Sequence, residues 1–145
     1  MSHMDAAAIA RRLALRGHRI TPGRRRVIEA VASAPAHFTV EDILRRAPRV
    51  GRATVFRTFR LLLEANVVCR VLLEDGSLHY RRSAAAHHHH LVCTLCGRIE
   101  DFTRCEVPEL VQGLARGSRF QVEGHWLEVY GRCASCAGAD GGRAT

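Results

Sequence analysis

Residues 87–97 read HHHHLVCTLCG, in which four consecutive histidines precede a Cys93-x-x-Cys96 pair and a glycine. A second pair with the same spacing, Cys133 and Cys136, lies farther along the chain. Each pair forms a tight turn that directs two sulfur atoms at one ion, so the four cysteines predict a tetrahedral zinc site. Because four protein ligands leave no position for water, we expect this zinc to be structural rather than catalytic.

The histidine run offers more ligands than that zinc can accept. Successive side chains of a β-strand point to opposite faces, so His88 and His90 would share one face and His87 and His89 the other. A low-complexity run or an affinity tag is the alternative, but a tag is not expected inside a chain directly before a cysteine pair. The sequence therefore predicts up to two further metal sites, one on each face of the strand.

Basic residues are unevenly distributed along the 145-residue chain. Residues 1–82 contain 16 arginines and 7 acidic residues, a balance of +9, whereas residues 83–145 have a balance of −1. The N-terminal part is therefore expected to bind a polyanion, with nucleic acid as the first candidate. Cysteines arranged as metal ligands indicate a reducing compartment, and no apolar run approaches the roughly 20 residues of a membrane span. We expect a cytoplasmic protein.

Four helices and a hairpin are expected in the first 82 residues. Capping signals mark the helix starts, among them Thr21 before Pro22 and the capping box that begins at Thr39. Asp75-Gly76 is a strong hairpin signal. The expected helices cover residues 5–16, a segment from 22, a short segment from 39 to 48, and residues 52–65, and the expected strands cover 67–73 and 78–82. This order predicts a winged helix-turn-helix, which is a DNA-binding fold.

The fourth expected helix carries the candidate DNA contacts. Val55, Phe59 and Leu62 form its apolar face, so the polar side chains near its start are free to enter a major groove. Arginines elsewhere are expected to hold phosphates. The candidate DNA-binding residues are Arg19, Arg52, Thr54, Phe56, Arg57 and Thr58.

The C-terminal half predicts a small α/β unit that is closed by the four cysteines. Its expected elements are strands over residues 88–93 and 98–102, a helix over 108–116, and a long strand over 120–130 that carries His125. Small, uncharged residues at 83–86 are expected to form a hinge, and the Gly/Ala-rich residues 137–145 a disordered tail. The predicted fold class is α/β (α+β), with one domain over residues 1–82 and a metal-binding domain over residues 87–136.

Three segments together resemble the ferric uptake regulator family. They are residues 87–97, residues 124–133 (GHWLEVYGRC) and residues 52–57 (RATVFR) on the proposed recognition helix. The resemblance covers nearly the whole chain. It implies a homodimeric, metal-dependent transcriptional repressor of metal-homeostasis genes that binds a double-stranded DNA operator. The residue 87–136 domain would then be the dimerisation domain.

The resemblance also implies a regulatory metal site between domains, made by His37, His88 and His90. Asp101 occupies a position that supplies an acidic ligand in some members. Zn²⁺, Mn²⁺ and Fe²⁺ all remain candidates for the effector, because imidazole accepts each of them and metal availability decides among sites of similar affinity.

The sequence departs from the family at the remaining regulatory ligand. Iron-type members place a glutamate where Arg81 stands, and many zinc-type members place a cysteine near Ser83. Cys69 and His79, on the two wing strands, are the replacements that the sequence offers. Because the usual wing acid is not evident, peroxide sensing is the less favoured of the family's activities.

The other histidine face corresponds to a second family site. His87 and His89 would join His125 and a glutamate, for which we expect Glu109. The family spacing falls on a proline, Pro108, so this assignment needs a shift of one residue, and Glu106 is the alternative.

Two other classes of protein compete with a regulator. A zinc-dependent hydrolytic enzyme could use three such ligands and an open position, but neither a His-Glu-x-x-His helix nor a deaminase motif occurs in the sequence. A metal-storage or zinc-ribbon interaction module would not need the arginine-rich winged helix. Coordination geometry and DNA binding distinguish these alternatives.

Overall fold

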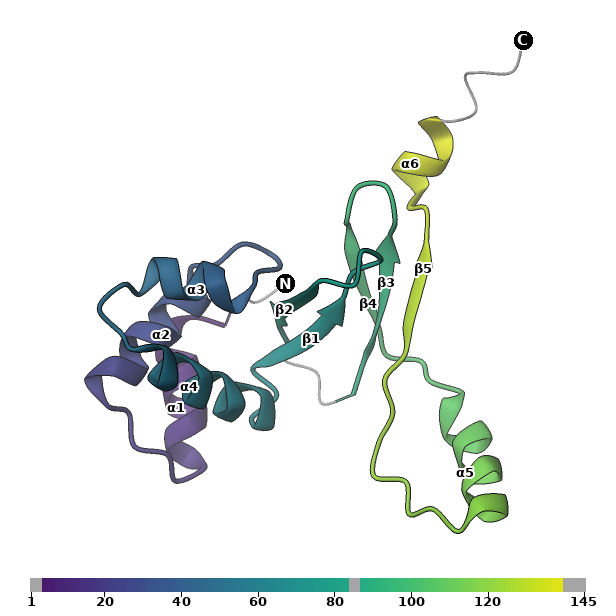
Figure 1. Ribbon diagram of the computed structural model, residues 1–145, viewed down its shortest axis with the longest axis horizontal. Coiled ribbons are helices and arrows are strands. Elements are labelled where there is room, and N and C mark those ends of the chain that lie inside the picture. Colours follow the sequence, from purple (N-terminus) through teal and green to yellow (C-terminus); the bar gives the residue numbers. More distant parts are fainter. Residues whose placement is uncertain (1–3, 84–86, 140–145) are drawn as a thin grey trace. The chain divides into compact units, whose positions relative to one another are not determined.

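The computed structural model describes residues 4–83 and 87–139 (Figure 1). The chain divides into two compact units, which we describe separately. The N-terminal unit contains residues up to 72 together with 77–86, and the C-terminal unit contains residues 73–76 together with 87 onward. Ser83 is the described residue of the expected hinge, and residues 84–86 lie outside the described ranges.

The helices of the N-terminal unit begin where the capping signals predict. Thr21 caps its helix through a hydrogen bond from the Arg24 amide to its hydroxyl (3.3 Å), and Thr39 and Asp42 form a reciprocal capping box. Asn66, with a φ of 52°, follows the last helix in the left-handed conformation that asparagine tolerates. The helices are α1 (Ala6–Leu15), α2 (Pro22–Ala32), α3 (Val40–Arg46) and α4 (Arg52–Glu64).

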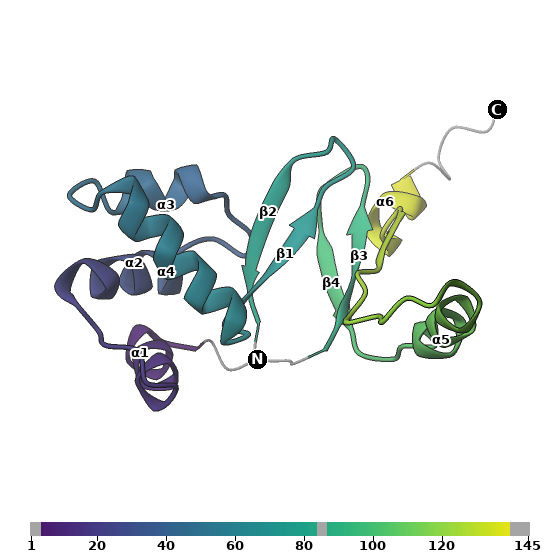
Figure 2. The same ribbon diagram turned by 60° about the horizontal axis from the view of Figure 1, so that its bottom comes forward.

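Apolar faces of these helices form one core, and a hairpin adjoins it. Ile9, Ile28 and Leu62 are among its fully buried members. Strands β1 (Val68–Leu72) and β2 (Leu78–Arg82) pair antiparallel, as Figure 2 shows. Because helices followed by this hairpin make a winged helix-turn-helix, the predicted fold of the N-terminal unit is confirmed.

Hydrogen bonds at two places help to attach the hairpin to the helical part. The Arg82 guanidinium donates to the carbonyl oxygens of Val31 (2.9 Å) and Ala34 (2.7 Å), which lie at the end of α2 and just beyond it. Phe38 and Tyr80 exchange backbone hydrogen bonds of 2.9 and 2.7 Å. The second contact aligns the segment before α3 with strand β2.

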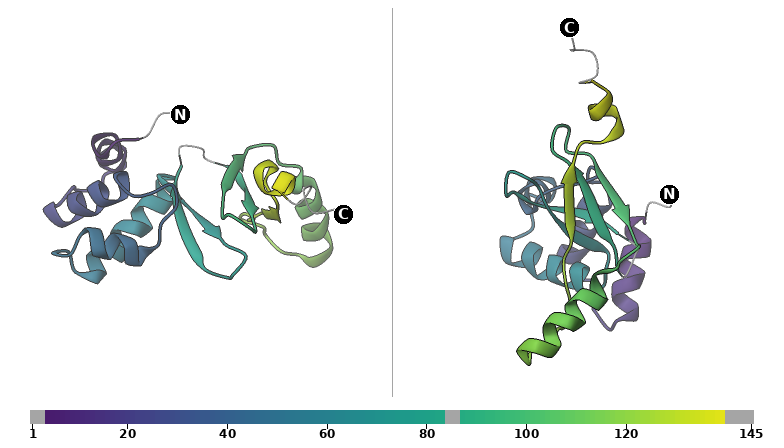
Figure 3. Two further views of the ribbon diagram at one scale, coloured as in Figure 1. Left: turned by 90° about the horizontal axis from the view of Figure 1, so that it is seen from above. Right: turned by 90° about the vertical axis from the view of Figure 1, so that its right-hand side faces the viewer.

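The C-terminal unit is built on a three-stranded sheet with the order β4-β3-β5. β3 (His89–Cys93) is central, pairing antiparallel with β4 (Ile99–Phe102) and parallel with β5 (Glu128–Gly131). Helices α5 (Val107–Ser118) and α6 (Ala134–Ala139) lie at opposite ends of this sheet (Figures 1 and 3). None of the helices described is long and apolar enough to cross a membrane.

The expected strand over residues 120–130 is wrong for most of its length. Only Glu128–Gly131 forms a strand, because these four residues pair with four residues of β3. Residues 120–127 have no partner strand among the residues described. The tail also differs from expectation. Residues 137–139, expected to be disordered, complete α6, which starts directly after Cys133, and residues 140–145 lie outside the described ranges.

Candidate metal centres and nucleic-acid interface

The four cysteines of the two Cys-x-x-Cys pairs converge at one end of the sheet. Cys93 is the last residue of β3, and Cys133 lies two residues after the end of its partner strand β5. The Sγ atoms of these two cysteines, Cys96 and Cys136 lie within 4.8 Å of one another. Gly97, with a φ of 70°, allows the first turn to close. Four sulfur ligands in a closed cluster fit a structural zinc ion.

Backbone amides around Cys93 favour its thiolate form. Hydrogen bonds from the amides of Cys133, Cys96 and Leu95 lower the pKa of the Cys93 thiol to about 6. The opposite holds for Cys136, whose hydrogen bonds to the sulfurs of the other three cysteines raise its pKa to about 12. Zinc takes cysteine ligands as thiolates, so zinc binding would release the protons of those thiols and couple metal affinity to pH.

His87, His89 and His125 gather on one side of β3. The ring centroids are 4.7 Å apart for His87 and His89, and 5.2 Å apart for the stacked rings of His89 and His125. Cys105, in the segment before α5, joins them, with its Sγ 3.3 Å from Nε2 of His125. One donor atom from each of the four residues lies within 4.8 Å of the others. Burial is the main cause that lowers the pKa of His89, which keeps its imidazole neutral and able to bind a metal.

The glutamates expected in this cluster lie elsewhere. Glu109 is an exposed residue in the first turn of α5, and Glu106 forms an ion pair with Arg104 (Nε to Oε1, 3.0 Å). Sequence reasoning missed Cys105, although it was one of two cysteines outside the Cys-x-x-Cys pairs. We shall refer to His87, His89, Cys105 and His125 as the Cys105 cluster.

His88 and His90 lie together, with ring centroids 5.0 Å apart. The register of the sheet places Asp101 of β4 and Glu128 of β5 beside His90 on the two neighbouring strands. His90 Nε2 is 3.9 Å from Asp101 Oδ1, and its Nδ1 is 3.7 Å from Glu128 Oε1. The separation of the run into two faces, predicted from strand alternation, is thus observed. Glu128 was missed, since only the parallel pairing of β5 brings it to His90.

A histidine pair lies in the N-terminal unit. The bridge between Phe38 and Tyr80 aligns the preceding residues, and the Nδ1 atoms of His37 and His79 are 3.0 Å apart. Burial is the largest cause that lowers the pKa of His37, followed by the nearby charges of His79 and Arg81. The neutral form of His37, which can bind a metal, is therefore favoured. Cys69 is paired with Arg81 across the hairpin, and its thiol donates weakly to the Arg81 carbonyl (3.8 Å).

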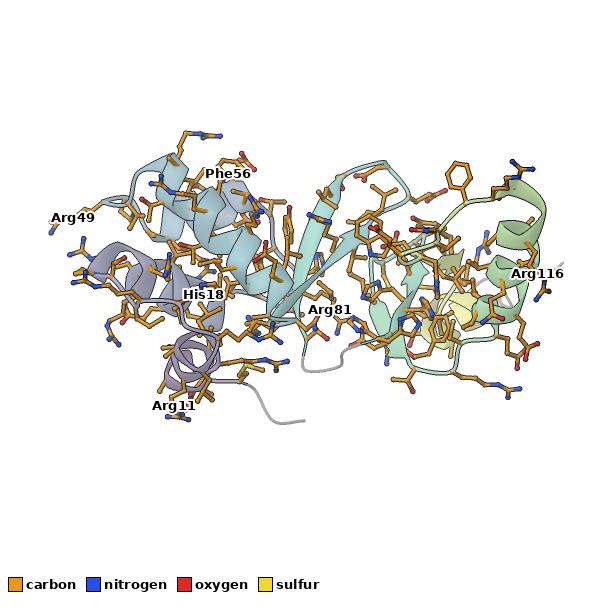
Figure 4. The ribbon with its side chains drawn as sticks, turned by 90° about the horizontal axis from the view of Figure 1, so that it is seen from below. Arg11, His18, Arg49, Phe56, Arg81 and Arg116 are labelled. Atoms are coloured by element: carbon orange, nitrogen blue, oxygen red, sulfur yellow. The ribbon has the colours of Figure 1, made fainter. Side chains whose placement is uncertain are left out.

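The start of α4 presents the expected polar surface. Arg52, Phe56 and Arg57 are exposed, and the Arg52 guanidinium lies 5.8 Å from the centre of the Phe56 ring. Phe56, which is labelled in Figure 4, is 49% exposed. Arg52 also approaches Glu41 (3.5 Å).

Two further candidates differ in exposure, and one expectation is wrong. Arg19 is exposed before α2, whereas Thr54 is half-buried. Thr58, expected on the DNA-facing surface, is buried, and its hydroxyl donates to the Thr54 carbonyl (2.7 Å). Threonine inside a helix commonly satisfies its hydroxyl in this way, so Thr58 belongs to the core side of α4.

A winged helix with an arginine-bearing recognition helix, joined to a unit with clustered histidines and cysteines, defines the class of metal-binding, DNA-binding regulators. The sequence model of the ferric uptake regulator family matches residues 15–130. The chain belongs to the ferric uptake regulator family.

Individual relatives agree with this assignment. The chain is 33% identical to the peroxide operon regulator of Bacillus subtilis (strain 168), over 83% of this chain and 86% of the relative. It is 31% identical to the ferric uptake regulation protein of the same organism, over 91% and 94%.

Solved structures show the same fold. The crystal structure of the Vibrio cholerae ferric uptake regulator is 27% identical and has a TM-score of 0.53, covering 85% of this chain and 98% of that one. A zinc uptake regulator complexed with zinc and DNA has a TM-score of 0.75 at 22% identity, covering 94% and 95%.

Proposed function

We propose that this metal-responsive transcriptional regulator is a cytoplasmic homodimer that binds a double-stranded DNA operator and represses metal-homeostasis genes when an effector metal is bound. The observation that carries the proposal is the presence of histidine pairs in both units. His37 and His79 lie in the DNA-binding unit, and His88 and His90 lie in the other. An ion that takes ligands from both would couple metal binding to DNA binding.

The proposed effector ligands are His37, His88, His90 and Asp101, with His79 and Cys69 as further donors and Glu128 as a second carboxylate. Imidazole and carboxylate ligands together accept zinc, manganese and ferrous iron. Binding would favour one arrangement of the two units, and only that arrangement would match both DNA half-sites. A four-cysteine zinc ion would keep the C-terminal unit folded throughout.

Exposed apolar side chains of the C-terminal unit support homodimer formation. Helix α5 has no buried residue, and Leu110 and Leu114 are each 65% exposed. Phe120 and Trp126, in the following segment, are each 75% exposed. Large apolar side chains exposed in such number are typical of a protein interface, and a second copy of the same unit would bury them.

A peroxide-sensing role is the second candidate, and the identity to the peroxide operon regulator supports it. It would require ferrous iron at the effector site and loss of DNA binding after peroxide treatment. A hydrolytic enzyme has less support, because the relatives are regulators and the four-cysteine cluster offers zinc no open position.

A metal-by-metal titration of DNA binding tests the proposal. The probe is a labelled duplex that the metal-loaded chain selects from a random-sequence pool, and zinc stays in the four-cysteine site. We expect one of Zn²⁺, Mn²⁺ or anaerobic Fe²⁺ to tighten binding by about 5- to 150-fold, the range typical of coupling between two sites. Binding that no metal changes, or no duplex binding at moderate salt, would contradict it.

A further inference from the structure

The Cys105 cluster combines donors from three separate segments of the C-terminal unit. His87 and His89 come from β3 and the residues before it, Cys105 from the segment before α5, and His125 from the segment before β5. Their donor atoms lie within 4.8 Å of one another. The ligand atoms of a tetrahedral zinc are about 3.3–3.8 Å apart, given its usual bond lengths. Small side-chain movements would bring the four atoms to that spacing.

His89 provides a second, independent observation. Its side chain is buried, with 1% of the residue exposed, and Nε2 has no hydrogen-bond partner among the residues described. The ring also forms a hydrogen bond with the backbone of Leu127, and because Nε2 has no partner, Nδ1 is the nitrogen that makes it. A buried polar atom in a native protein normally has a partner, and a hydrogen bond at the far nitrogen is how metal-bound histidines are oriented. An ion at the centre of the cluster would give Nε2 that partner.

We propose that Cys105 is a metal ligand and completes, with His87, His89 and His125, a Cys-His₃ zinc site that is separate from the effector site. On binding, Cys105 gives up its thiol proton to solvent and coordinates as the thiolate, while the three neutral imidazoles each donate one lone pair. Four protein ligands close the site. Its role is to tie β3 to the segments before α5 and before β5.

The cysteine determines which metals this site takes. Thiolate ligands favour zinc over manganese and ferrous iron, whereas carboxylates favour the harder ions. Glu106 and Glu109, the nearby acids of the sequence, are not members of the cluster. We therefore expect the Cys105 site to keep zinc bound even when manganese or ferrous iron is concentrated enough to fill the effector site.

Cobalt(II) binding to the Cys69→Ser chain tests the proposal. In that chain, with zinc in the four-cysteine site, Cys105 is the one thiol left outside it. Tetrahedral cobalt bound to a thiolate gives a sulfur-to-metal charge-transfer band in the near ultraviolet. We expect an intensity that corresponds to one thiolate-bound cobalt per chain, without release of zinc, and no band after the additional change Cys105→Ser. Cobalt at the effector site has no thiolate ligand in this chain and adds nothing to the band.

Two variants sharpen the result. Zinc affinity, measured by competition with a chromogenic chelator, should fall at least about tenfold in Cys105→Ser. Loss of a residue that is only hydrogen-bonded to a metal ligand already lowers metal affinity by about that factor. Cys105→Asp should also lack the band but bind manganese more tightly than its parent. A band that survives Cys105→Ser, or no band in the Cys69→Ser chain when cobalt is in excess over both sites, overturns the assignment. Because no DNA is involved, such a failure leaves the proposed function standing.

Discussion

His89 and His90 are adjacent and both buried, yet their side chains have different surroundings. His89 lies with two other imidazoles and a thiol, whereas His90 lies between two carboxylates. Alternation along the strand separates them, because neighbouring side chains of a strand point to opposite faces. Neighbours in sequence are therefore expected to have separate roles.

His90→Ala and His89→Ala should separate these roles. We expect His90→Ala to abolish the metal-dependent part of DNA binding, while the dimer and the four-cysteine zinc survive. His89→Ala should lower the free energy of unfolding by about 1–3 kcal/mol, which is common for the loss of a buried side chain. It should reduce the effect of metal on DNA binding without eliminating it. Anisotropy titrations with DNA and thermal unfolding measure the two effects. An equal loss of metal response in both variants would contradict the two-face arrangement.

At the scale of elements, α4 and its flanking segments place the DNA contacts. Val55, Phe59 and Leu62 fix one face of α4 in the core, and Thr58 is buried with them. Phe56 and Arg57 are therefore held outward. A helix anchored in this way presents its first turns to a major groove, and the arginines around it hold phosphates.

Arg57→Ala should weaken operator binding by about 1–3 kcal/mol, because that is the usual cost of a lost base contact. Metal content and dimerisation should be unchanged. Arg60→Ala is the matched control, since Arg60 is an exposed arginine farther along α4 that pairs with Glu64 (2.9 Å). Gel-shift titrations that show equal weakening for both, or none for Arg57→Ala, would place the base-reading surface elsewhere.

At the scale of the whole molecule, each unit is stabilised in a different way. The N-terminal unit has a continuous apolar core, to which almost all the large buried side chains belong. The described part of the C-terminal unit buries few, among them Val92, Cys93 and His89. A unit with so small a core needs another source of stability, and metal ions are one such source.

Cys96→Ser or Cys136→Ser should release zinc and unfold or monomerise the C-terminal unit. Structural zinc contributes about 10–16 kcal/mol in small zinc-binding peptides, which is comparable to the whole stability of a domain. Cys69→Ser is the control for folding and dimerisation, because it removes a thiol outside the four-cysteine cluster and should leave the C-terminal unit folded and dimeric. Zinc content and sedimentation equilibrium check the result. A variant that lost the four-cysteine zinc and remained a stable dimer would count against a structural role.

The sequence by itself determined the features that depend on neighbouring residues. Caps at Thr21 and Thr39, the Asp75-Gly76 turn and the alternation of the histidine run are local, so they could be predicted. The winged helix followed from their order, and the cysteine spacing indicated a common cluster. Tertiary structure decided which distant residues meet. Cys105 joins His125, and Glu128 joins His90, only through the course of the chain around α5 and the parallel register of β5. Residues 120–127 look like a strand but have no partner strand among the residues described, and strand pairing depends on a partner that the local pattern does not specify.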